Sequence, residues 1–112
     1  MAAESVRQVF EELLPKGIAE NADKAADIDA IYQFEITGDD GGTWVLDLTK
    51  DSDWISEGPS DDAQCTIEVA DEDWLAILNG ELNAMQAFMM GKLRVSGDMG
   101  LATKLQMVFS MA

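Results

Sequence analysis

The stretch Gly97-Asp98-Met99-Gly100 has two glycines spaced as in some loops that clamp nucleic-acid phosphates. The carboxylate of Asp98 would repel a phosphate there, which argues against that chemistry. A Walker loop around Gly91-Lys92 is also excluded, because Gln86 and Leu93 stand where it needs Gly and Ser or Thr. The stretch instead predicts a structural turn, in which Asp98 caps a helix and the glycines permit a sharp reversal with close backbone approach.

Other residue types narrow the chemistry further. The chain has no histidine, which excludes His-based triads and His-ligated metals. Its single cysteine, Cys65, alternates with Ile67 and Val69, so we interpret it as a small core side chain. No nucleophile–base pair is apparent. We therefore predict no catalytic residue, no metal site and no cofactor, and we do not expect an enzyme.

The charge balance restricts the partners. The 22 acids and seven bases give a formal net charge of −15. Such a surface repels nucleic acid, and it argues against strong binding to an anionic membrane. The acids indicate either an ordinary solvated surface or adaptation to high salt, and the sequence leaves both open.

Length and composition predict a single domain over residues 1–112, since 47% of the residues are apolar. No apolar run approaches the roughly 20 residues that span a bilayer. The start, Met1-Ala2-Ala3-Glu4, does not resemble a secretory signal, and the end is not a Ser-Lys-Leu signal. A cytoplasmic location is the expectation.

The elements that must position the turn follow from periodicity. Helical spacing predicts one helix over residues 6–14, ended or kinked at Pro15 and Gly17, then a short helix and a linker over 18–29. Alternation predicts five strands, at residues 32–37, 44–49, 54–57, 64–69 and 92–96. The first two form an antiparallel hairpin, and the one-sided apolar pattern indicates a sheet covered on one face.

Three helices are predicted in the last third of the chain. Asp71 would cap the first, which presents Trp74, Ile77 and Leu78 and stops at Gly80. Asn83 would cap a second helix over residues 84–90, and Asp98 a third over 99–110. The third is apolar over a wider arc than packing on one sheet face requires. This surplus is either ordinary core or the lining of a cavity, for which flexible methionines are suited.

The same region resembles the sterol-carrier-protein (SCP2-like) domain family. The resemblance rests on Met85-Gln86-Ala87-Phe88-Met89 and on Gly91 to Leu105, in which Met90 stands where family members often carry Gln. Upstream stretches also fit: Tyr32 to Gly38, Gly41-Gly42-Thr43-Trp44 and Asp73-Trp74.

The resemblance implies an α+β fold with a five-stranded, mainly antiparallel sheet covered by helices, and a hydrophobic tunnel for fatty acids, acyl-CoA, sterols or phospholipids. The last helix would then be a lid on a lipid cavity. The predicted lining residues are Ile77, Met85, Phe88, Met89, Leu101, Leu105, Val108 and Phe109. A soluble lipid carrier is the first reading of this family likeness, and an accessory module that presents apolar substrates to a partner enzyme is the alternative.

The net charge leads to a prediction about salt. Adding KCl to about 1 M shortens the Debye length to about 3 Å, which relieves self-repulsion and should raise the melting temperature. A variant with several acids changed to Asn or Gln should show a smaller rise in a thermal scan. An equal rise in both proteins would show that screening is not the cause.

Overall fold

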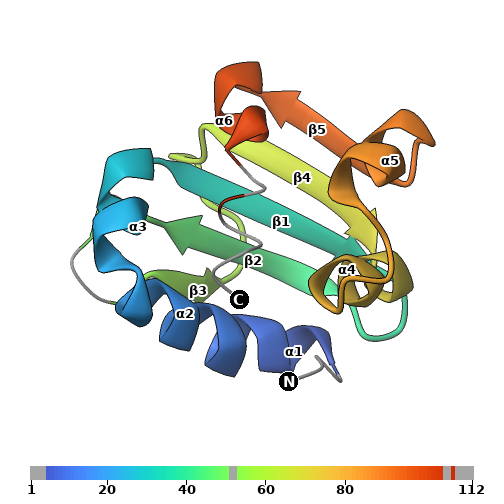
Figure 1. The fold of residues 1–112 in the computed structure, drawn as a ribbon, viewed down its shortest axis with the longest axis horizontal. Coiled ribbons are helices and arrows are strands. Elements are labelled where there is room, and N and C mark those ends of the chain that lie inside the picture. The colour runs from blue at the N-terminus through green and yellow to red at the C-terminus, as the bar shows by residue number, and fades with distance from the viewer. Residues whose placement is uncertain (1–4, 51–52, 105–106, 108–112) are drawn as a thin grey trace.

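The computed structural model describes residues 5–50, 53–104 and 107, and a mixed five-stranded sheet forms its centre. The strand order is β3-β2-β1-β4-β5 (Figure 1). The strands are β1 (Ile31–Thr37), β2 (Gly42–Asp47), β3 (Ile55–Glu57), β4 (Cys65–Ala70) and β5 (Leu93–Gly97). All five lie within one or two residues of the predicted strands.

Three of the four strand pairs are antiparallel, and β1 and β4 run parallel. The predicted hairpin between β1 and β2 is confirmed, with Phe34 opposite Trp44. On the other side of β1, Phe34 lies opposite Ile67 of β4. The α+β fold with a mainly antiparallel sheet is therefore confirmed.

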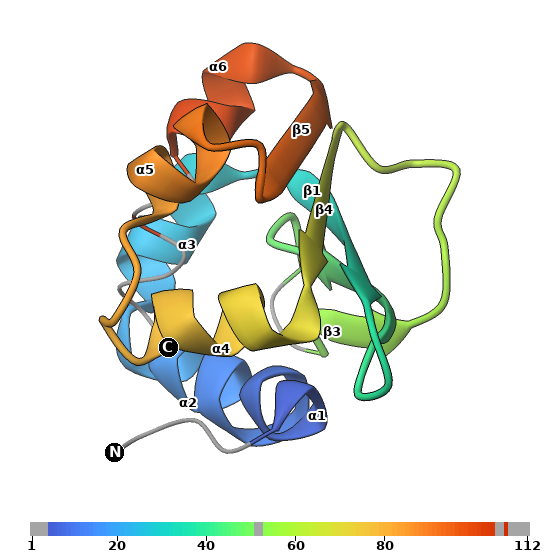
Figure 2. The ribbon, with the colours of Figure 1, turned by 90° about the vertical axis from the view of Figure 1, so that its right-hand side faces the viewer.

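The helices lie on one face of the sheet, while the β3–β4 connection passes the other (Figure 2). They are α1 (Val6–Gln8), η1 (Val9–Leu13), α2 (Leu14–Glu20), α3 (Ala22–Ile28), α4 (Asp71–Leu78), α5 (Ala84–Met89) and α6 (Met99–Thr103). The covered face carries the apolar side chains of the alternating strands, as β1 and β4 show most clearly in their burial. No helix in the described ranges has the length and apolar character needed to cross a bilayer.

The first helix continues through Pro15, so of the two predicted alternatives, an end or a kink, the end is excluded. Residues 9–13 form a π-helical segment, in which the N–H of Leu14 donates to the carbonyl of Val9. The wider turn accommodates a proline, which lacks an N–H and would otherwise crowd the preceding carbonyls. The helix then runs to Glu20, and α3 replaces most of the expected linker.

The N-cap of α4 is Ala70 rather than Asp71. The carboxylate of Asp71 accepts hydrogen bonds from the backbone N–H groups of Glu72 at 2.8 Å and Asp40 at 3.0 Å. Asp40 in turn accepts from the N–H of Val6 at 2.9 Å. These acids therefore tie the β1–β2 turn to the starts of two helices.

Stacked aromatic rings form the centre of the core. Phe10 lies between Trp44 and Trp74, with ring centroids 5.0 Å and 5.3 Å away and nearly parallel planes. Phe34 packs against Phe10 at 5.5 Å and Trp74 at 5.2 Å in tilted arrangements. The stack joins the first helix, the sheet and α4.

Replacing Phe10 by Ala should lower the free energy of unfolding by about 3–5 kcal/mol, because the substitution leaves a cavity among three aromatic rings. Urea denaturation measures the change. The same substitution at the exposed Phe88 is the control and should cost about 1 kcal/mol or less. Equal losses at the two positions would show that the stack contributes nothing special.

Candidate functional site

The candidate site lies at the β5 edge of the sheet, with α5 near the start of β5 and α6 at its end (Figures 1 and 2). Its floor is the helix-covered face of β1, β4 and β5, which presents buried Tyr32, Ile67 and Leu93. Val95 and Leu101 are partly buried and pack against this core. The floor is apolar, and the two helices that cover it, α5 and α6, are short.

The turn between β5 and α6 is built as the sequence predicts. Gly97 has φ +95°, and a Cβ there would lie 2.5 Å from the carbonyl oxygen of Gln64. The carboxylate of Asp98 accepts from the N–H groups of Gly100 at 2.8 Å and Leu101 at 3.3 Å. Gly97 and Asp98 therefore set the direction in which α6 leaves β5. The predicted close backbone approach and the predicted helix cap are both confirmed.

The hydroxyl of Tyr32 donates a 2.8 Å hydrogen bond to the carbonyl of Leu101. This bond joins β1, in the middle of the sheet, to α6. Burial raises the pKa of Tyr32 to about 12, with smaller contributions from negative charge at Cys65 and Asp98. Burial also raises the pKa of the Cys65 thiol, which agrees with a core role for that residue.

Helix α5 is set by signals at both ends. The carboxamide oxygen of Asn83 accepts from the N–H groups of Met85 at 2.8 Å and Gln86 at 3.3 Å, as predicted. At the other end Gly91 has φ +79°, and the chain turns directly into β5. This helix buries Ala87 and packs half-buried Ala84 against the core, while its remaining side chains are exposed.

The predicted lining residues divide into three groups. Ile77 is buried in the core cluster, and Leu101 packs against that cluster. The α5 side chains Met85, Phe88 and Met89 share one side of that helix and are exposed, so they do not lie in the buried floor. Leu105, Val108 and Phe109 lie outside the described residues. The lining of a cavity by these residues stays a prediction.

Sequence reasoning did not assign Tyr32 to the site. It was counted only as one of the alternating apolar residues of a strand. The signal available was its hydroxyl, because a buried tyrosine usually finds a hydrogen-bond partner. The partner carbonyl lies 69 residues further along the chain, which no local pattern reveals.

A hollow of about 520 Å³ also opens between the first helix and β3, lined in part by Phe10, Trp44 and Trp54. Its rim carries Glu11 and Glu57, which accept from Arg7 at 2.8 Å and 3.3 Å. These carboxylates already have a cation as partner. Within the described ranges, no group of three or more acidic, Cys or His side chains could hold a metal ion.

Comparisons with known proteins agree on one family. The sequence model of the SCP-2 sterol transfer family matches residues 10–110. The chain is 45% identical over 78 residues to hydroxysteroid dehydrogenase-like protein 2 of Rattus norvegicus, which covers 69% of this chain and 15% of that protein. It is 38% identical over 101 residues to human sterol carrier protein 2, covering 88% of this chain and 18% of that protein.

Solved structures show the same fold. The solution structure of palmitated SCP2L2 from Aedes aegypti superimposes with a TM-score of 0.76 at 28% identity, and covers 95% of both chains. The curated relatives are much longer, since the chain spans less than a fifth of their length.

The hydrogen bond of Tyr32 leads to a prediction about pH. The raised pKa means that the neutral phenol stabilises the fold below pH 10, and that this contribution is lost between about pH 10 and 12. Tyr32→Phe should lower the free energy of unfolding by about 1 kcal/mol at neutral pH. The free energy of unfolding of this variant should fall less than that of the unmodified protein between about pH 10 and 12. Urea titrations at several pH values measure both effects. Parallel losses in the two proteins would show that Tyr32 does not cause the change.

Proposed function

The chain belongs to the SCP-2 sterol transfer family, and we propose that it binds an apolar lipid under α5 and α6 and transfers it. The ligand classes are fatty acids, fatty acyl-CoA, sterols and phospholipids. The observation that carries the proposal is the family match together with an apolar floor beneath two short helices.

The construction of the site supports this proposal. Each of the two covering helices has fewer than eight residues, and their side chains are largely exposed or half-buried. The bond from Tyr32 to Leu101 fixes α6 to the sheet centre. Elements with few buried apolar contacts open at low free-energy cost, and a ligand must displace such a cover to reach the floor.

We propose that Ile77 and Leu101 contribute to the lining from within. Met85, Phe88 and Met89 would border the mouth of the cavity, which their exposure on α5 supports. Leu105, Val108 and Phe109 complete the proposed lining from beyond α6. Methionine suits a mouth that must fit different lipids, because its side chain is flexible and polarisable.

The energy of such binding is sufficient without polar contacts. Burying a methylene group contributes about 0.8 kcal/mol, so an acyl chain of about 16 carbons offers roughly 12 kcal/mol. Association and ordering of the ligand oppose a large part of this. We therefore expect affinities between micromolar and nanomolar, with weak discrimination between chain lengths.

A second role is favoured by the relatives. The rat protein that the chain resembles is several times longer and is named as dehydrogenase-like, and the match covers only 15% of it. We propose as the alternative that this chain presents apolar substrates to a separate enzyme. In either role the chain itself is a binding protein without catalysis.

The proposal is tested by filling the cavity. Leu101→Trp adds bulk at a half-buried position beside the floor, and should weaken binding of a fluorescent fatty acid about tenfold or more. Titration of the fluorescence measures the dissociation constant. Native mass spectrometry of the unmodified protein should show a co-purified lipid.

Leu13→Trp is the matched control, because Leu13 is also partly buried but lies on the first helix. It should leave the affinity within about twofold. If both variants fold and bind the probe like the unmodified protein, the ligand does not occupy the space beside Leu101. Failure of the unmodified protein to bind any acyl chain would reject the proposed function.

A further inference from the structure

The large exposed apolar side chains gather in one part of the chain. Within the described residues, every large hydrophobic that is substantially exposed lies between positions 85 and 107. The most exposed are Met89 at 79%, Met90 at 60%, Met85 at 53% and Met99 at 51%. Large apolar side chains exposed in one segment of a chain favour an interaction site there.

The charges divide along the same boundary. Residues 84–107 carry three basic side chains, Lys92, Arg94 and Lys104, and one acid, Asp98. The preceding residues carry four bases and 21 acids. The net charge of −15 is therefore an average over a strongly acidic body and a weakly basic segment.

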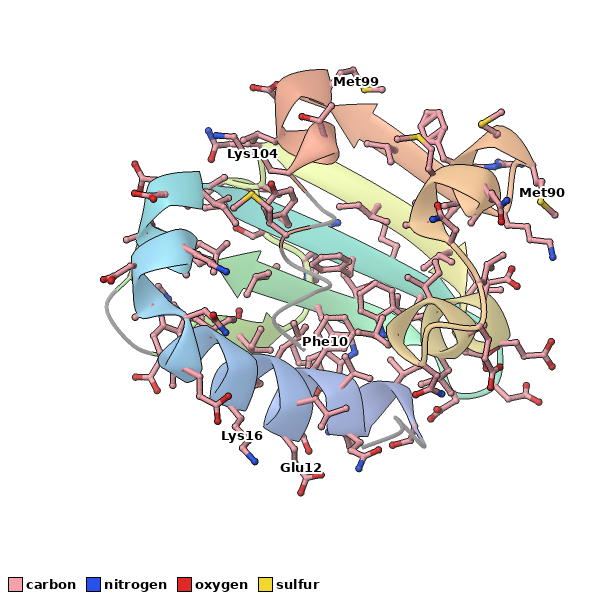
Figure 3. All side chains as sticks on the ribbon, in the orientation of Figure 1. Phe10, Glu12, Lys16, Met90, Met99 and Lys104 are labelled. Atoms are coloured by element: carbon pink, nitrogen blue, oxygen red, sulfur yellow. The ribbon has the colours of Figure 1, made fainter. Side chains whose placement is uncertain are left out.

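The structure places this segment at one edge of the molecule. Met90 and Met99 lie at the β5 edge, whereas Glu12 and Lys16 lie on the first helix beyond the opposite edge (Figure 3). Lys92 and Lys104 are exposed and take part in no ion pair between described residues. Arg94 is 3.8 Å from Glu68, so its charge is partly balanced.

We propose that the edge formed by α5, β5 and α6 docks reversibly on a phospholipid bilayer that contains anionic lipid. Flexible methionines can enter the interface, while the exposed Lys92, directly before β5, and Lys104, directly after α6, would meet phosphate groups. The charges favour this edge, because residues 84–107 carry three bases and one acid, whereas the acidic remainder of the chain would be repelled. The proposal goes beyond lipid binding, and its test needs no lipid in the cavity.

The charge division predicts an unusual dependence on salt. At about 0.01 M ionic strength the Debye length is about 30 Å, which is close to the longest dimension of the molecule, 32 Å. The whole acidic body then feels the surface, and binding should be weak. At about 0.15 M the Debye length is about 8 Å, so the docked edge dominates and binding should strengthen.

Flotation with vesicles made of equal parts phosphatidylcholine and phosphatidylglycerol tests the proposal. The unmodified protein should float more at about 0.15 M salt than at about 0.01 M. The pair Lys92→Glu and Lys104→Glu should reduce binding at least about tenfold, because each basic group near such a surface contributes about 1 kcal/mol. The pair Lys16→Glu and Lys24→Glu changes the net charge equally and should leave binding within about twofold.

The apolar part is tested with Met90→Gln and Met99→Gln together, which keep side-chain length. This variant should float less than the unmodified protein at both salt concentrations. Hydrogen exchange should show slower exchange in residues 84–104 on vesicles, and no change in β2.

Several outcomes would overturn the proposal. The unmodified protein could fail to float at either salt concentration, or the two lysine pairs could lose binding equally. A dimer in sedimentation that Met90→Gln and Met99→Gln abolish, without flotation, would assign the edge to a second copy of the chain. Normal flotation with no fatty-acid binding would reject the proposed function and leave the docking edge standing.

Discussion

The placement of Phe10 between Trp44 and Trp74 constrains where a cavity can lie. The two stacked contacts connect the first helix, β2 and α4, and Phe34 of β1 packs against two of the three rings. Aromatic side chains in contact at these distances leave no room for an acyl chain. The space between these rings, at one end of the helix-covered sheet face, is therefore filled, although a hollow opens beside them toward β3. We propose that the ligand uses the other end.

The other end has different physical properties. Its cover consists of α5 and α6, which contact the core through buried Ala87, half-buried Ala84 and Leu101, and a hydrogen bond from Tyr32. The aromatic stack can keep the protein folded while α5 and α6 open, because segments with fewer buried contacts open at a lower free-energy cost. This division of the core would reconcile stability with the opening that the proposed site requires for a bulky apolar ligand.

The sequence predicts most of the sheet because a covered sheet imposes alternation of apolar residues, visible in Tyr32, Phe34 and Ile36. It also predicts the turn at Gly97 and Asp98, since both act through contacts or conformations with recognisable chemistry.

The continuation of the helix through Pro15 was missed because a π-helical turn leaves no signature in periodicity. The role of Tyr32 was missed because its partner, Leu101, is distant in the sequence. Exposure of Met85 and Met89 depends on which face of α5 meets the sheet, and an all-round apolar helix does not reveal this.

The proposed docking edge and the proposed cover of the cavity share α5 and α6, and this coincidence has a consequence for transfer. A lipid that passes through water exposes its chain, at about 0.8 kcal/mol for each methylene group. An opening that faces the bilayer removes much of this cost, and removes most for the longest chains. Docking through the acidic body would bring the wrong face to the membrane and leave the cost in place. The direction in which the protein presents its apolar edge therefore matters more for transfer than the strength of docking, which can stay weak and reversible.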